Sequence, residues 1–312
     1  MDRWFYTLDD LPQGAVLAAG TFDGVHLGHE AIFEAARTFA ATRGEVPWVF
    51  SFLGHPAQIL HPENVPGAIQ DEAMQMWCLH RDGTHRLILQ PFDATFAELS
   101  AEAFANRLRG ATIFCGEDWR FGKGAQGSPD FLRERGFDVH VIPYAEYKGE
   151  RISSTRIREA MAMGLMRDVA GMLGRPWGYC GPVVHGRQLA GKTFGVPTCN
   201  IPYVAQGHQP LAPLGYGVYA ATATLLPPTG ATQTYPALVN FGIAPTIKDD
   251  PTPHFEAHLL GAYGDYYGWM VQLSFEHDRL RPEQKFDSID ALKAQIVLDA
   301  RAVCDQLGVV YQ

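Results

Sequence analysis

The sequence predicts two domains of different class: an α/β domain with a parallel sheet over residues 1–174, and a small antiparallel β-barrel with a closing helix over residues 175–312. Three observations predict this. The chain has 312 residues, and domains usually span about 100–200. The first half alternates short apolar runs with helical periodicity, whereas after Gly174 the apolar runs become short and are bounded by turn residues. Gly174 and Pro176 end a helical stretch, so the boundary is placed there.

In the first half, stretches of strand pattern and stretches of helical pattern follow one another. Strands are expected at 15–20, 46–53, 86–90, 112–115 and 137–142, and helices at 27–42, 70–81 and 100–109. Such alternation predicts parallel strands joined by right-handed crossovers. In sheets of this kind a ligand binds at the carboxyl ends of the strands, where the loops carrying Gly24 and Gly116 would meet.

In the second half, the expected strands are short and rich in β-branched residues. They lie at 179–185, 196–201, 217–226, 235–240, 254–260 and 270–275. A helix is expected at about 288–307, with Ile289, Leu292, Ile296 and Val303 on one face. That apolar face predicts docking of the helix on the barrel.

Composition and charge limit the classes of function. Apolar residues make up 46% and charged residues 19%, which is typical of a globular protein. The net charge is −9 and both halves are acidic, without the basic stripe of a nucleic-acid-binding surface, but a small anion such as a nucleotide remains a possible ligand. Five cysteines without a C-x-x-C pair indicate neither a disulfide framework nor a zinc cluster. No signal-peptide pattern follows Met1 and no apolar run approaches 18 residues, so we expect a cytoplasmic protein without a membrane partner.

The segment GTFDGVHLGH at 20–29 follows the first expected strand and opens the first expected helix. Its glycines, Gly20, Gly24 and Gly28, would let the backbone approach a phosphate, and the amino end of a helix favours an anion. His26 and His29 are three residues apart, so both rings can face the same side of the first turn. Two imidazoles there could donate hydrogen bonds to charge that develops on a phosphorus centre.

Two other interpretations of this segment remain open. In the first, His29 caps the helix or packs against it, and His26 is a surface residue. In the second, the two histidines bind zinc. The zinc interpretation lacks further ligands, because Asp23 is the only candidate nearby.

Two later segments of the first half also suit phosphate binding. GEDWRFGKG at 116–124 follows an expected strand and contains Asp118 and Arg120. ISSTRIR at 152–158 opens a helix with Ser154, Thr155 and Arg158. Hydroxyls can cap a helix and arginine can bind phosphate through two donors, although an ordinary helix cap followed by solvated arginines would give the same pattern.

The H-x-G-H and I-S-S-T-R-I-R motifs resemble those of the nucleotidyltransferase superfamily. With the W-R-F-G-K loop between them, they are similar to the FAD synthetase module of bacterial bifunctional riboflavin kinase/FAD synthetases. The resemblance implies a Rossmann-like domain that transfers the adenylyl group of ATP to FMN and releases pyrophosphate, with His26 and His29 as catalytic residues. It implies nucleotide and phosphate binding by Gly20, Phe22, Asp23, Gly24, Gly28, Asp118, Arg120, Ser154, Thr155 and Arg158.

In the second half, GPVVHG at 181–186 is followed by GKTFGVPTCN at 191–200. The segments combine a glycine-rich loop with one basic residue, Lys192. Thr198 and Asn200 are two residues apart on an expected strand and therefore point to the same side. A hydroxyl and an amide suit a Mg²⁺ ion that keeps most of its waters and is shared with nucleotide phosphates. The alternative is a barrel turn with a proline at a strand edge.

Glu256 lies between two histidines on another expected strand. Strand alternation places it on one face with His254 and His258, opposite Phe255 and Ala257. A carboxylate on the polar face of a half-buried strand could accept a proton from a substrate hydroxyl. The alternative is a charge partner across the sheet.

The G-x-P-T-x-N motif with a later glutamate resembles the riboflavin kinase module of the same family. The resemblance implies that Glu256 is the catalytic base, that Thr198 and Asn200 bind Mg²⁺, and that Gly186, Lys192 and Gly195 bind ATP. The expected enzyme converts riboflavin to FMN and FMN to FAD, with small-molecule partners only and with ATP as co-substrate in both steps. Two rivals remain: a flavin-binding or regulatory protein with one inactive module, and an adenylyltransferase for another phosphorylated substrate.

Overall fold

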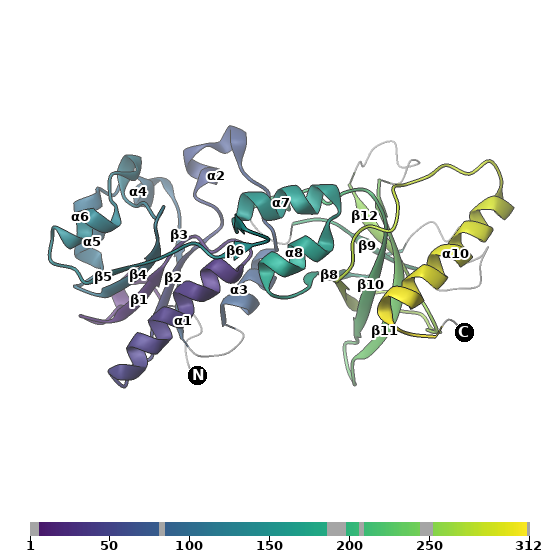
Figure 1. Ribbon diagram of the computed structural model, residues 1–312, viewed down its shortest axis with the longest axis horizontal. Coiled ribbons are helices and arrows are strands. Elements are labelled where there is room, and N and C mark those ends of the chain that lie inside the picture. The colour runs from purple at the N-terminus through teal and green to yellow at the C-terminus, as the bar shows by residue number, and fades with distance from the viewer. Residues whose placement is uncertain (1–5, 81–84, 186–197, 206–208, 244–251, 311–312) are drawn as a thin grey trace. The chain divides into compact units, whose positions relative to one another are not determined.

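The computed structural model describes residues 6–80, 85–185, 198–205, 209–243 and 252–310 (Figure 1). The chain forms two compact units. The first comprises Met1–Ser154 with Gln206–Pro210, and the second comprises Thr155–Ala205 with Leu211–Gln312. The predicted domain boundary at 174/175 stays a prediction, since it rests on sequence pattern alone.

The first unit is built on a five-stranded sheet in the order β3-β2-β1-β4-β5, with every neighbouring pair parallel. The strands are β1 Val16–Ala19, β2 Trp48–Leu53, β3 Arg86–Pro91, β4 Thr112–Gly116 and β5 Val139–Ile142. The order changes direction between β1 and β4. The loops that follow these two strands therefore lie at the switch point of the strand order, where α/β sheets commonly bind ligands.

Helices cover both faces of this sheet. Helices α1 Leu27–Thr42 and α3 Glu72–His80 pack in one core, and α4 Ala94–Ala97, α5 Ala101–Arg107 and α6 Pro129–Arg133 pack in the other. The unit also contains the short helix α2 Ala57–Leu60 and single 3-10 turns at Leu8–Asp10, Pro62–Asn64 and Lys123–Ala125. A small hairpin of β6 Glu146–Tyr147 and β7 Glu150–Arg151 precedes the second unit.

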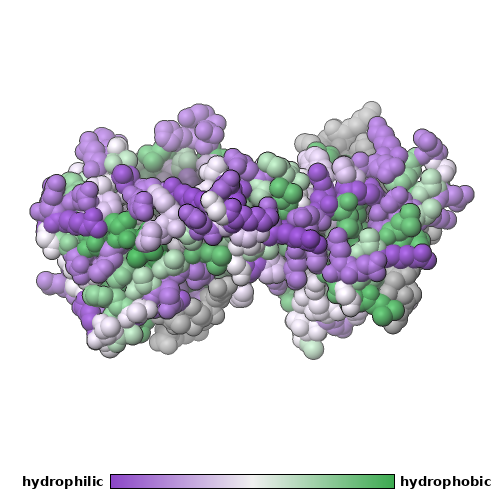
Figure 2. Space-filling model, viewed as in Figure 1, coloured by the Kyte–Doolittle hydropathy of each residue, from purple (hydrophilic) through white to green (hydrophobic). Residues whose placement is uncertain are grey.

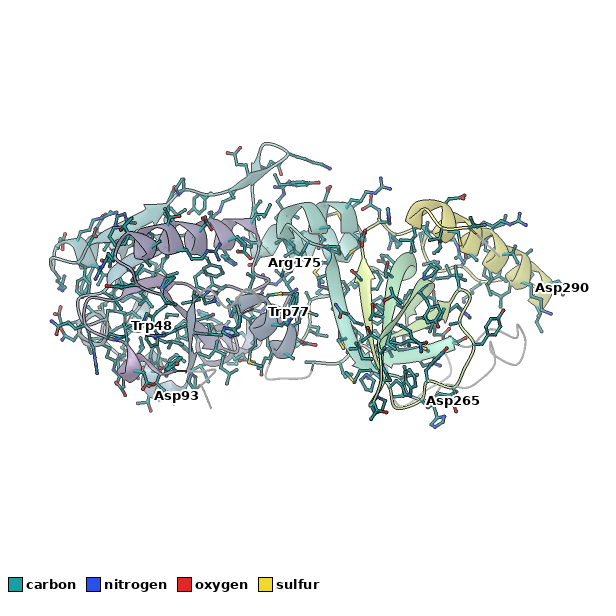
Figure 3. The ribbon with its side chains drawn as sticks, turned by 90° about the horizontal axis from the view of Figure 1, so that it is seen from below. Trp48, Trp77, Asp93, Arg175, Asp265 and Asp290 are labelled. Carbon is teal, nitrogen blue, oxygen red and sulfur yellow. The ribbon has the colours of Figure 1, made fainter. Side chains whose placement is uncertain are left out.

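Successive residues of β1 belong to two different cores, because side chains alternate along a strand. Leu17 packs in the core that includes Phe104 of α5, and Val16 packs in the core that includes Phe33 of α1. Trp48, visible in Figure 3, lies edge-on to Tyr6 with ring centroids 5.0 Å apart. Because β1 is buried on both faces, its sequence is a continuous apolar run rather than an alternation of apolar and polar residues.

In the second unit, the described residues form an antiparallel sheet together with helices α7 Ser154–Met163, α8 Met166–Leu173 and α10 Ile289–Leu307. The strands of this sheet are β8 Trp177–Pro182, β9 Thr198–Pro202, β10 Gly217–Leu226, β11 Gln233–Gly242, β12 His254–Leu259 and β13 Met270–Phe275. The strand order is β8-β13-β10-β11-β12-β9. The two outer strands approach each other where the backbone N–H of Val184 donates to the carbonyl of Asn200 over 2.8 Å. The sheet is therefore curled, and the predicted fold class is confirmed.

Helix α10 packs on the curled sheet through Ala300 and Val303, which join an apolar cluster with Val218 and Leu238. Ser288 caps its start and Gly308 ends it in a left-handed conformation. The prediction for Ile289 was wrong: its side chain is 63% exposed, because the first turn of α10 lies outside that cluster.

Helices α7 and α8 make backbone contacts within the second unit. The carbonyl of Met161 accepts from the N–H of Gly215 over 3.0 Å, and that of Gly164 accepts from the N–H of Arg279 over 2.9 Å. Hydrophilic side chains dominate the face shown in Figure 2, with smaller apolar areas among them. Within the described ranges, no helix is both long and apolar enough to cross a membrane.

Candidate active sites

The histidines of the H-x-G-H motif lie together at the start of α1. His26 is the N-cap residue, and its Nδ1 accepts a hydrogen bond from the backbone N–H of His29 over 3.3 Å. The two rings are stacked, with centroids 3.6 Å apart and planes 19° from parallel. His26 is buried. The capping residue is thus His26 rather than His29, and both imidazoles occupy one side of the helix start.

The loop before these histidines has an unusual backbone. Phe22 and Val25 have positive φ angles of 52° and 43°, although neither is a glycine, and both side chains are buried. Such angles are costly for bulky residues and are held only where surrounding packing enforces them. Gly24 has φ +80°, and a Cβ atom there would lie 2.8 Å from Ile69. Buried side chains and the contact with Ile69 therefore fix the shape of this loop.

Gly28 makes room for the ring of His26. A Cβ atom at this position would lie 3.0 Å from Cε1 of His26 and 3.1 Å from its Nδ1. These distances are shorter than ordinary van der Waals contacts, so a side chain here would displace the imidazole. Gly20 is similarly constrained, because a Cβ atom there would lie 2.6 Å from the ring of Phe22.

Asp23 ties this loop to two other segments of the first unit. Its Oδ1 accepts from the backbone N–H of Ile69 over 3.1 Å, and its backbone carbonyl accepts from the hydroxyl of Ser154 over 3.1 Å. The carboxylate is buried, and its contact with Ile69 stabilises the loop. The Ser154 contact brings the start of the I-S-S-T-R-I-R motif to the H-x-G-H loop. Thr155 and Arg158 lie in the second compact unit.

The loop after β4 has internal contacts of its own. Asp118 forms an ion pair with Arg151 of β7, with Oδ2 and Nη2 2.5 Å apart. The guanidinium of Arg151 also lies 3.4 Å from the ring centroid of Tyr144. Arg120 donates to the carbonyls of Glu117 and Trp119. Asp118 and Arg120 are thus held by the protein itself at the carboxyl end of the sheet.

In the second unit, strand register brings the predicted metal ligands and the predicted base together. Within the antiparallel pair of β9 and β12, Asn200 lies opposite Glu256 and Thr198 lies opposite His258. Residues directly opposite on antiparallel strands project to the same face. The hydroxyl of Thr198 lies 3.2 Å from Nδ1 of His258. Gly186, Lys192 and Gly195, which were predicted to bind ATP, lie outside the described residues.

Glu256 is ionised at neutral pH. A hydrogen bond from His254 lowers the pKa of this carboxyl despite the opposing effect of burial, and Nε2 of His254 lies 3.3 Å from Oε1 of Glu256. The same bond raises the pKa of His254. Burial lowers the pKa of His258, which favours its neutral form. Glu256 is therefore in the state that accepts a proton.

Two family profiles match successive parts of the chain. The FAD synthetase family profile matches residues 8–156, and the riboflavin kinase family profile matches residues 173–307. A bifunctional riboflavin kinase/FMN adenylyltransferase from Pseudomonas fluorescens is 33% identical over 309 residues, which cover 96% of this chain and 95% of that protein. The chain belongs to this family. The Escherichia coli K12 protein of the same description is also 33% identical, over 95% of this chain and 94% of its own length.

A solved structure extends the comparison to three dimensions. The crystal structure described as a macrolide-efflux protein from Streptococcus pneumoniae superposes with a TM-score of 0.83 at 28% identity. The superposition covers 96% of this chain and 99% of that one. The two-unit fold of this riboflavin kinase/FMN adenylyltransferase family member is therefore shared along nearly its whole length.

The donor set on the riboflavin kinase half suits Mg²⁺. It consists of a hydroxyl at Thr198 and an amide at Asn200, which offer the hard oxygen donors that this ion prefers. Among the described residues, no three histidines, cysteines or carboxylates are grouped to hold a metal. Cys199 lies between the two proposed ligands but is buried among core residues, and this burial raises the pKa of its thiol to about 12. It therefore stays a neutral thiol, a poor ligand for this ion.

Sequence reasoning missed one carboxylate near this site. Gly242 of β11 lies opposite His254, and a Cβ atom at Gly242 would lie 2.1 Å from Oε1 of Glu283. The carboxylate of Glu283 thus occupies the space that a side chain at 242 would take. Neither Gly242 nor Glu283 alone predicts this contact, because the two residues are distant in the sequence.

Proposed function

We propose that the chain is a bifunctional enzyme that phosphorylates riboflavin to FMN with ATP and then adenylylates FMN to FAD with a second ATP, releasing pyrophosphate. The observation that carries the proposal is the match of both family profiles and of the relatives along about 95% of the chain. In each matched half, reactive side chains lie together: the stacked histidines at α1, and Glu256 opposite Asn200 in the curled sheet.

In the kinase reaction, Glu256 would accept the proton of the ribityl 5′-hydroxyl while the hydroxyl oxygen attacks the γ-phosphorus of ATP and ADP leaves. Thr198 and Asn200 would hold Mg²⁺, which neutralises charge on the phosphates when bound. Gly186, Lys192 and Gly195 would bind the nucleotide. The ionised state of Glu256 and the common face of the three side chains support these roles.

In the adenylyltransferase reaction, a phosphate oxygen of FMN would attack the α-phosphorus of ATP and pyrophosphate would leave. His26 and His29 would donate hydrogen bonds to the charge that develops on the phosphates. The phosphate nucleophile is already ionised near neutral pH, so this step needs no general base. The remaining nucleotide contacts would come from Gly20, Phe22, Asp23, Gly24, Gly28, Asp118, Arg120, Ser154, Thr155 and Arg158.

The experiment that tests this proposal is incubation of the purified chain with riboflavin, ATP and Mg²⁺, followed by chromatographic separation of riboflavin, FMN and FAD. We expect FMN and then FAD. A parallel reaction that starts from FMN tests the second step alone, and added EDTA tests the need for a divalent ion. Flavin binding without any product would favour the rival of a regulatory protein. FMN production without FAD would favour adenylylation of a different phosphorylated substrate.

A further inference from the structure

His254 is placed to act on the carboxylate of Glu256. Both residues project from the same face of β12, and Nε2 of His254 lies 3.3 Å from Oε1 of Glu256. The two side chains are 20% and 38% exposed, so the contact lies at the edge of the unit rather than in its core. A partly exposed carboxylate on a flexible stem keeps rotamer freedom unless a partner holds it.

The imidazole of His254 is itself held from two sides. It forms a hydrogen bond with the backbone of Thr252. Across the sheet it lies opposite Gly242, where the carboxylate of Glu283 takes the place of a side chain and attracts the imidazolium. His254 thus links the backbone before β12 to Glu256, with a second carboxylate nearby.

We propose that His254 is a positioning residue that fixes one oxygen of Glu256 and thereby directs the other toward the substrate hydroxyl. This inference rests on the proposed role of Glu256 as the base. In the reaction, the O–H bond of the ribityl hydroxyl breaks, its oxygen forms a bond to the γ-phosphorus, and the bond from phosphorus to ADP breaks. The proton goes to Oε2 of Glu256, while Oε1 stays bound to His254.

In many enzymes, a further side chain orients the catalytic base that accepts the proton. Here His254 would orient Glu256 in that way. The other residues that face Glu256 do not fill this role. Asn200 and Asn240 lie opposite it on β9 and β11, but among the described contacts its side-chain hydrogen bond is with His254. His258 uses its Nδ1 toward Thr198. His254 is therefore the side chain whose removal should disorder the base without removing it.

The test is a double-mutant cycle on the kinase activity of the full chain. His254→Phe keeps a flat ring of high strand propensity but removes the donor, and it should lower kcat by about tenfold or more while riboflavin KM changes by less than about twofold. His254→Gln restores an N–H donor and should recover kcat to within about threefold of the parent. In a Glu256→Gln background, His254→Phe should cause no further loss, because the carboxylate that it positions is absent.

The chain contains a matched control. His61 also lies two residues before a glutamate and within 3.7 Å of it, but both side chains are about 70% exposed and lie in the first unit. His61→Phe should leave kinase kcat unchanged. Equal FMN production by His254→Phe and the parent, with Glu256→Gln impaired, overturns the positioning role alone. Full turnover of Glu256→Gln overturns the proposed base as well. Additive losses in the double variant show that His254 acts elsewhere. Thermal unfolding of each variant separates these outcomes from misfolding.

Discussion

The Oγ1 atom of Thr198 lies 3.2 Å from Nδ1 of His258, its register partner on the neighbouring strand. Because burial lowers the pKa of His258, its neutral imidazole can accept the proton of the threonine hydroxyl. A hydroxyl that donates to histidine keeps its lone pairs for a cation. In the proposed Mg²⁺ site, His258 would therefore orient Thr198 as outer partners orient metal ligands in other proteins.

The first prediction concerns this hydroxyl. Thr198→Val keeps the shape and strand propensity of threonine but removes the oxygen, and it should raise the KM for MgATP in the kinase reaction by about tenfold or more. Excess Mg²⁺ should restore part of the activity. Thr198→Ser, which keeps the hydroxyl, should stay close to the parent, and FAD formation from FMN should be unaffected. A kinase that loses activity equally at all Mg²⁺ concentrations would contradict a metal role.

The second prediction compares the stability of α1 with the rate of FMN adenylylation when a residue at the start of this helix is changed. Gly28→Ala should favour the helix by up to about 1 kcal/mol through propensity. It should nevertheless lower FMN adenylylation, because the new Cβ would press on the ring of His26. Gly171→Ala, in α8, is the control and should leave FAD formation unchanged. Adenylylation at the parental rate in Gly28→Ala would show that the position of His26 is not critical.

The third prediction tests whether the two activities are separable. His29→Ala removes a ring that stacks on His26, and it should lower FAD formation by about 10²-fold or more. Riboflavin phosphorylation should remain near the parental rate, because Glu256 and Thr198 lie in the other compact unit. Both rates are measured on the same preparation. A comparable loss of both would argue against independent sites.

The fourth prediction is a pH dependence of stability. The pKa of Glu256 is lowered in the folded state, so its contribution is present above its ordinary pKa of 4.5 and is lost as pH falls through the lowered value. The pKa of His254 is raised, so its contribution is complete below its ordinary pKa of 6.5 and is lost as pH rises through the raised value. Both contributions coincide between these two ordinary values.

The difference in unfolding temperature between the parent and Glu256→Gln should therefore be greatest at about pH 5–6 and should shrink on either side. His258 also titrates: burial lowers its pKa and Glu256 raises it, so the loss of Glu256 removes a second contribution that, like that of His254, is lost as pH rises. Thermal unfolding over pH 3–9 measures the difference. A difference that does not vary with pH would show that the His254–Glu256 pair does not stabilise the fold.

The fifth prediction concerns the minimal kinase. Helices α7 and α8 bury Ile157, Met161, Met166, Val169 and Met172 and bond to the backbone near Gly215 and Arg279. A fragment of residues 155–312 should fold and produce FMN. A fragment of residues 175–312 should unfold at a lower temperature, since each buried apolar side chain contributes about 1.5–3 kcal/mol. Equal unfolding temperatures would show that the two helices do not stabilise the sheet.

Sequence patterns correctly predict a helix or strand when residues within it or next to it determine where it begins and ends. The ranges of α1, β10 and β13 agree with prediction, because periodicity and flanking turn residues define them locally. Contacts between distant segments leave no such local signal. The approach of Glu283 to Gly242 and the pairing of Asp118 with Arg151 depend on how remote loops fold together. Ile289 continues the apolar periodicity of α10. Periodicity does not show, however, that the first turn of the helix lies outside the apolar cluster on which the rest of the helix packs.

The same limit applies to the sites. Motif spacing predicted that His26 and His29 share one side of a helix start, and that Glu256 shares a face with His254 and His258. It could not predict which histidine contacts which partner, because this depends on the register between β12 and β9. In that register, the imidazole of His258 contacts the hydroxyl of Thr198, and the imidazole of His254 contacts the carboxylate of Glu256.

The alternation of β12 makes this strand intolerant of any change in length. Phe255, Ala257 and Leu259 are fully buried on one face, while His254, Glu256 and His258 occupy the other. Deleting or inserting a single residue would turn the reactive groups inward and the core residues outward. Insertions should thus accumulate in the connecting loops, whereas β12 should keep its length among functional relatives. The fold thus requires the spacing of this strand as much as its residue types.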